Sequence, residues 1–110
     1  MPTHDSFLES RWHSLTIAEQ LGNIGSEVSR TATAQNTNKA RFEGAVERAI
    51  ELFNLTLDDP RWRRTERARE IGRAKELFCD AITGGGEYGV NLQDIQQYFD
   101  DFAILAQNRR

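Results

Sequence analysis

Five carboxylates on two predicted helices are the first residues in this chain whose type and spacing could do chemistry. Carboxylate oxygens are ligands that magnesium prefers, so acids that line a helical bundle can hold this ion. The acids in question are Glu43, Glu47, Glu51, Glu76 and Asp80. Within each group the neighbours are four residues apart. The three glutamates share one face of their helix, which we expect to be solvated.

All-helical nucleotide pyrophosphohydrolases resemble this chain in carrying acid pairs on two helices. Their pairs follow Glu-x-x-Glu and Glu-x-x-Asp spacing, whereas Glu47/Glu51 and Glu76/Asp80 are four apart. A di-iron bundle would need Glu-x-x-His pairs. Both histidines, His4 and His13, lie outside the predicted helices. The sequence therefore predicts no metal site and no cofactor.

Three further features of the sequence occur in some catalytic sites, but here each lacks the neighbouring residues that catalysis needs. His13 has no nucleophile or orienting carboxylate placed with it for acid–base chemistry. Cys79, the single cysteine, follows a phenylalanine on a largely buried helix and is predicted to fill the core. The Gly84–Gly86 run lacks the preceding strand and the following Lys-Ser/Thr of a phosphate-binding loop. We therefore expect no catalytic residue and no enzymatic activity.

A basic segment is the clearest candidate for binding an anion or an acidic partner. Between Arg61 and Lys75 there are seven basic and two acidic residues, a net charge of +5. Because the whole chain has a net charge of −3, the residues outside this segment have a net charge of −8. Arginines in the first turn of a helix oppose its dipole, and a tryptophan beside them is available for stacking. The alternative is that these arginines pair with Asp58, Asp59 and the acidic faces of neighbouring helices or subunits. The candidate residues are Arg61, Trp62, Arg63, Arg64 and Arg67.

A row of small residues on the first predicted helix is the candidate interface. Its members recur at helical spacing: Ala18, Gly22, Gly25, Ser29 and Ala32. Each glycine inside a helix costs roughly 1 kcal/mol relative to alanine, so close packing should compensate. Either an aromatic side chain of the same molecule packs there, from among Phe42, Phe53, Phe78 and Phe102, or a second copy of the chain does.

Capping signals and apolar spacing predict the helices that position these residues. Thr16 and Glu19 have capping-box spacing, and Asp59-Pro60 is typical of an N-cap followed by a first helical residue. The predicted helices cover about 16–32, 39–54 or slightly beyond, 60–83 and 91–106. The first of them buries the stripe Ile17, Leu21, Ile24, Val28 and Thr31.

The remaining segments connect these helices. Residues 1–13 are predicted to be a lead-in, with Phe7, Leu8 and Trp12 available to cover an end of the core, and no segment shows the two-residue alternation of a strand. The predicted fold is all-α, a four-helix antiparallel up-down bundle, in a single domain over residues 1–110.

Composition and charge narrow the class of protein further. The 110 residues have a net charge of −3, 38% hydrophobic and 28% charged residues, which is typical of one globular domain. No signal peptide and no run of roughly 18 apolar residues is evident. The expected location is the cytoplasm.

Two segments are similar to a family of small helical prokaryotic proteins with no established activity. They are the stretch 18–28, AEQLGNIGSEV, and the later Phe42 with 48–52, RAIEL; Tyr98-Phe99 and Phe102 fit the same pattern. The helix count also resembles that of HEPN-type bundles, some of which are ribonucleases or toxin–antitoxin components. Their Arg-x(4–6)-His motif is absent here, so the resemblance does not imply ribonuclease activity.

Together these features favour a non-enzymatic helical protein that works through protein–protein association. Self-association as a dimer or larger homo-oligomer is expected from the small-residue row and the segregated charge. The alternative is a nucleic-acid-binding or toxin–antitoxin accessory protein that uses the basic start of the third predicted helix.

Overall fold

The computed structural model describes residues 6–107, and every regular element in that part of the chain is a helix. The helices are α1 (Ser6–Ser14), α2 (Ile17–Ala34), α3 (Lys39–Leu57), α4 (Glu66–Ile82) and α5 (Leu92–Gln107). The all-α prediction is confirmed. None of the helices described is both long enough and apolar enough to cross a membrane.

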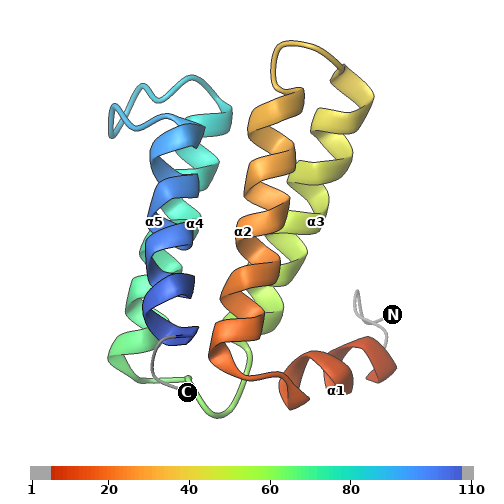
Figure 1. The fold of residues 1–110 in the computed structure, drawn as a ribbon, viewed down its shortest axis with the longest axis vertical. Coiled ribbons are helices and arrows are strands. Elements are labelled where there is room, and N and C mark those ends of the chain that lie inside the picture. Colours follow the sequence, from red (N-terminus) through yellow and green to blue (C-terminus); the bar gives the residue numbers. More distant parts are fainter. Residues whose placement is uncertain (1–5, 108–110) are drawn as a thin grey trace.

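Helix α1 was not predicted, so the described chain has five helices where we expected four. Figure 1 shows α1 at a steep angle to the others, near the first turn of α2 and the last turn of α3. Trp12 of α1 is only 5% exposed, and its Nε1 atom donates a 2.9 Å hydrogen bond to Oγ1 of Thr56. Leu8, however, is exposed, so α1 lacks the continuous apolar stripe by which a helix is predicted from sequence. The side chain of Phe7 lies outside the described residues.

The other four helices lie side by side, and each runs opposite to the helix before it (Figure 1). Helix α2 occupies the centre, since it packs extensively against both α3 and α5, whereas α4 makes fewer contacts with its neighbours. The predicted simple up-down bundle is thus incomplete as a description of the chain, because α1 adds a fifth element across one end.

Three of the helix starts are produced by local capping. Thr16 and Glu19 form the predicted capping box, in which each side chain accepts a hydrogen bond from the other residue's backbone N–H. Asn38 caps α3 through a hydrogen bond from the Arg41 N–H. Asn91 and Asp94 make the same reciprocal pair before α5. Such caps satisfy backbone donors that a helix terminus otherwise leaves unpaired.

The predicted start of a helix at Pro60 is wrong, because α4 begins at Glu66 and its N-cap is Thr65. The chain makes one turn after Asp59, with the N–H groups of Trp62 and Arg63 donating to the Asp59 carbonyl. It then leaves the helical region at Arg64, whose φ is 62°. The Asp59 side chain does not cap a helix. Its fully buried carboxylate accepts hydrogen bonds from Arg61 in the same turn and from Gln20 of α2.

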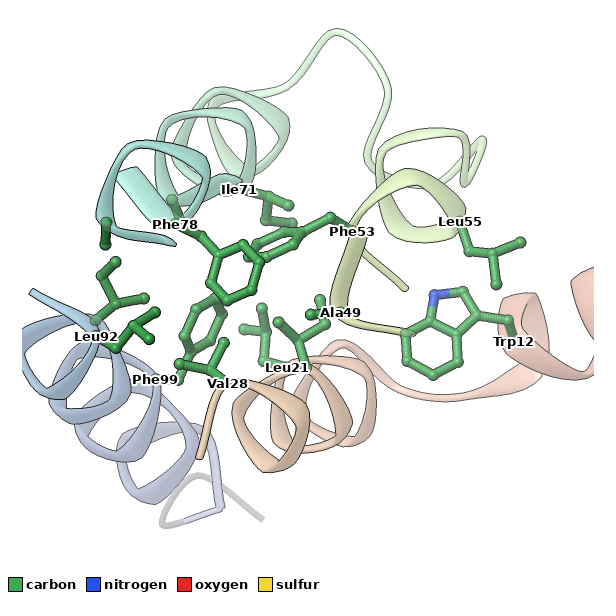
Figure 2. Close-up of a cluster of buried hydrophobic side chains, with 14 residues drawn as sticks. Trp12, Leu21, Val28, Ala49, Phe53, Leu55, Ile71, Phe78, Leu92 and Phe99 are labelled. Carbon is green, nitrogen blue, oxygen red and sulfur yellow. The ribbon is translucent and has the colours of Figure 1, made fainter. Parts of the chain in front are cut away.

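An aromatic cluster forms the centre of the core (Figure 2). Phe53 of α3 lies with its ring centre 5.7 Å from that of Phe78 of α4 and 5.8 Å from that of Phe99 of α5. The predicted stripe of α2 faces this cluster: Leu21, Ile24, Val28 and Thr31 are buried and Ile17 is half-buried. In Figure 2, Trp12 and Leu55 lie apart from the three phenylalanines, on the side of α1. Trp12 therefore covers one end of the core, as predicted.

Candidate interaction surfaces

A buried carboxylate organises the end of the molecule where α1, α2 and the α3–α4 link meet. Oδ1 of Asp59 accepts hydrogen bonds from the backbone N–H and from Nε of Arg61, at 3.0 and 3.1 Å. Oδ2 accepts from Nη2 of Arg61 at 2.7 Å and from Nε2 of Gln20 at 2.9 Å. Burial raises the pKa of Asp59, but these hydrogen bonds and the Arg61 charge outweigh it and lower the pKa to about 2. Asp59 is thus a fully satisfied structural anion.

Gln20 extends this network to both tryptophans. Its side chain is fully buried, and its Nε2 atom also donates to the carbonyl of Trp12 at 2.9 Å. Its Oε1 atom accepts a 2.8 Å hydrogen bond from Nε1 of Trp62. Arg61 completes the set, because Nη2 donates to the Leu15 carbonyl at 2.6 Å and its guanidinium lies 4.6 Å from the centre of a Trp62 ring. These contacts join four segments at one end of the helices.

The predicted basic cluster is therefore divided between two environments. Arg61 and Trp62 belong to the buried network, through Asp59 and Gln20. Arg63 and Arg64 are exposed, and no ion pair involves either of them within residues 6–107. Arg67 is half-buried at the start of α4. A role for Arg63, Arg64 and Arg67 toward an anion or a partner stays a prediction.

The predicted small-residue row faces α5, and one of its glycines is in close contact with it. A Cβ atom placed on Gly25 would lie 3.2 Å from Cβ of Phe99, whereas one on Gly22 would meet nothing within 4 Å. The aromatic residue at Gly25 is thus Phe99, which is not among the four that we named; the side chain of Phe102 lies outside the described residues. Ser29, Gln96 and the two glycines line a polar hollow of about 440 Å³ between α2 and α5.

The rest of the row is partly covered by the same molecule. Ala32 packs against the core and Ala18 is half-buried. Contact of this row with a second copy remains a prediction.

An apolar groove of about 490 Å³ lies between α4 and α5, two helices that pack together much less closely than α2 does with α3 or α5. Its floor is made of aliphatic side chains, Ala74, Leu77, Val90 and Ile95. Tyr98, 41% exposed, stands at its α5 edge. Partial burial and the nearby Glu70 carboxylate raise the pKa of the Tyr98 hydroxyl above its ordinary value. A neutral phenol hydroxyl can donate a hydrogen bond.

The two edges of this groove differ in charge. Arg69 and Arg73 lie on the α4 edge with Glu70 between them, and Asp94 lies on the α5 edge. This groove was not predicted from the sequence. The available signal was that Leu77 and Tyr98 extend the apolar faces of α4 and α5 beyond their fully buried residues.

The loop between α4 and α5 closes one end of the groove. Gly84 and Gly85 have φ of 108° and 71°, which ends α4 at the glycine run as predicted. Both Asp80 side-chain oxygens accept backbone N–H groups from the loop, those of Glu87 and Tyr88. The Arg73 guanidinium lies 5.8 Å from the centre of the Tyr88 ring. Val90, at the end of this loop, lines the groove.

The structure places the remaining candidate catalytic residues individually. His13 is part of α1, not outside the helices as we predicted, and its Nε2 atom lies 3.2 Å from the Leu55 carbonyl. Cys79 is half-buried. Within residues 6–107 no group of three or more His, Cys, Asp or Glu side chains is placed to hold a metal ion. His4 lies outside the described residues.

The resemblances noted for residues 18–28, 42–52 and 98–102 remain hypotheses about this chain. Comparison with models of protein families, with curated proteins and with solved structures found no match.

Proposed function

We propose that this protein acts without catalysis, through association with a second copy of itself, and that the α4–α5 groove is the contact. The observation that carries this proposal is the character of the groove: an open aliphatic floor between a basic edge and an acidic one. Apolar floors with charged rims are typical of protein–protein interfaces.

The charge pattern of the groove favours a second copy as the occupant. Residues 66–75, the first half of α4, contain four basic and two acidic residues, whereas α5 contains three aspartates and no basic residue. An isologous dimer needs a surface that is complementary to itself. A two-fold axis parallel to the groove would place α4 of each copy opposite α5 of the other. Basic and acidic edges would then meet twice.

Such an arrangement also covers the exposed apolar residues. Leu77 and Tyr98, which lie at the edge of the core of one copy, would be buried between the two copies. Removing apolar area from water in this way stabilises association. Arg73 of one copy would face the edge that carries Asp94 in the other, which selects the orientation more than it adds affinity.

Sedimentation velocity over micromolar concentrations tests this proposal. The full chain should form dimers, and Arg69→Glu should weaken them at least about tenfold, because it reverses the basic edge at both contacts. Arg69 is largely solvent-exposed, and its ion pair with Glu66 lies on the surface, so the fold should survive.

The matched control is Arg63→Glu, which makes the same charge change at an exposed residue outside the groove. It should leave the dimer unchanged. A chain that is monomeric throughout, or equal effects of the two substitutions, would contradict the proposed contact.

A further inference from the structure

A second hollow, of about 470 Å³, lies where α2 ends and α3 begins. Three arginines from the two helices line it: Arg30, Arg41 and Arg48. No carboxylate is among the described residues that line it. Nothing in the charge pattern of the sequence indicates this site, because the three residues are spread over two helices.

A buried glutamate positions two of these arginines. Glu27 of α2 is 8% exposed. Its Oε2 atom lies 2.8 Å from Nη1 of Arg30, and its Oε1 atom lies 3.2 Å from Nε of Arg48 on α3. One carboxylate therefore draws two guanidinium groups from different helices together. Each guanidinium has five N–H donors, so most of their donors are still available to a ligand.

The third arginine and several hydroxyls complete the lining. The side chain of Arg41 has no ion pair or hydrogen bond with any residue in the described part of the chain. Ser29 and Thr33 also line the hollow. With Glu27 counted, the three arginines leave a local charge of +2. Because Glu27 balances only one of the three positive charges, the remaining like charges repel one another, and an anion bound here would relieve this repulsion.

We propose that this hollow binds a small phosphate-bearing anion. Guanidinium groups pair with phosphate oxygens in two-pronged hydrogen bonds, and a phosphate group offers oxygens to several of them at once. The volume lies within the range of small-molecule sites, roughly 300–1,000 Å³. Hydroxyls such as those of Ser29 and Thr33 can donate to oxygens that the arginines leave unpaired.

This site is separate from the basic residues that precede α4. In Figure 1 the α2–α3 turn is at the opposite end of the helices from the α3–α4 link, which carries Arg63 and Arg64. The hollow also shares no residue with the α4–α5 groove. Binding of an anion can therefore be tested independently of self-association.

The experiment is a titration of the isotope-labelled full chain with sodium pyrophosphate at low ionic strength, followed by amide NMR shifts. Saturable shifts should be confined to residues near the hollow, about 29–41 and 48. Arg41→Gln should weaken binding about tenfold by removing one charged partner. Arg63→Gln, which removes the same charge at an exposed position, should change binding less than about twofold.

Two results would overturn the site and one would change its ligand. Absence of saturable shifts up to about 10 mM pyrophosphate, which corresponds to less than about 3 kcal/mol of binding, excludes a specific anion site. Equal weakening by both substitutions would show general attraction to a basic surface. If a short single-stranded oligonucleotide displaces pyrophosphate and its affinity depends on Arg63 as well, a free small phosphate is the wrong ligand.

Discussion

Nη2 of Arg61 lies 2.7 Å from Oδ2 of Asp59, and this contact joins an exposed turn to a carboxylate that is fully buried. The same carboxylate accepts a hydrogen bond from Gln20 on α2. The pair therefore links the α3–α4 connection to α2, at the end where Trp12 covers the core.

The Asp59→Asn variant should lower the free energy of unfolding by about 2 kcal/mol or more. The amide keeps the shape but leaves Arg61 without its counter-charge, and breaking one side of a buried pair is costly; because Arg61 is partly exposed, water offsets some of this loss. Urea denaturation measures the change. Asp58→Asn, at the exposed neighbouring residue, should stay within about 0.5 kcal/mol of the original chain. Similar losses for both variants would rule out the buried pair as the cause.

The free energy of unfolding should decrease at low pH because of the same carboxyl group. The pKa of Asp59 is lowered from 3.8 to about 2 in the folded chain, so its contribution is complete above pH 3.8 and disappears as the pH falls toward 2. A shift of this size corresponds to about 2 kcal/mol. Denaturation at pH 5 and pH 2 should show the loss in the original chain and a smaller one in Asp59→Asn. An identical pH dependence in both would assign the acid sensitivity to other groups.

Alanine substitutions at the two central glycines of α2 should have opposite effects. Gly22→Ala should raise the free energy of unfolding by up to about 1 kcal/mol, because alanine favours the helix and its Cβ meets nothing within 4 Å. Gly25→Ala should lower it by about 1 kcal/mol, because the new Cβ lies 3.2 Å from Cβ of Phe99. Phe99 packs against Phe53 and cannot easily move away. Thermal melts of the two variants give the sign of each change in stability. If both substitutions stabilise the chain, the Phe99 side chain can move to make room for the new Cβ.

Self-association through the α4–α5 groove should weaken as salt is added. The two charged edges attract each other across the proposed contact, and salt screens pairs of exposed charges. We expect the dimer dissociation constant to rise about threefold or more between 0.05 and 0.5 M sodium chloride. Sedimentation at these two concentrations measures it. A dimer that tightens with salt would be held by apolar contact alone, without the predicted pairing of Arg73 with the Asp94 edge.

Sequence patterns were sufficient for several features that have a local cause. Thr16 and Glu19 form the predicted capping box because the two residues lie three positions apart, although the equally local cap of α4 by Thr65 was not predicted. The glycine run that starts at Gly84 ends α4 because glycine adopts positive φ without a steric penalty. The buried stripe of α2 also follows from the helical period alone.

Tertiary contacts decided the features on which the proposals depend. Asp59 does not cap α4; its carboxylate instead binds Arg61 in the same turn and Gln20, 39 residues earlier in the chain. Arg30 and Arg48 meet at Glu27 only because α2 and α3 pack side by side. Residue spacing determines which side of a helix carries a group. It does not determine which other helix packs against that side, because this depends on how the apolar faces and buried charges of all the helices are accommodated together.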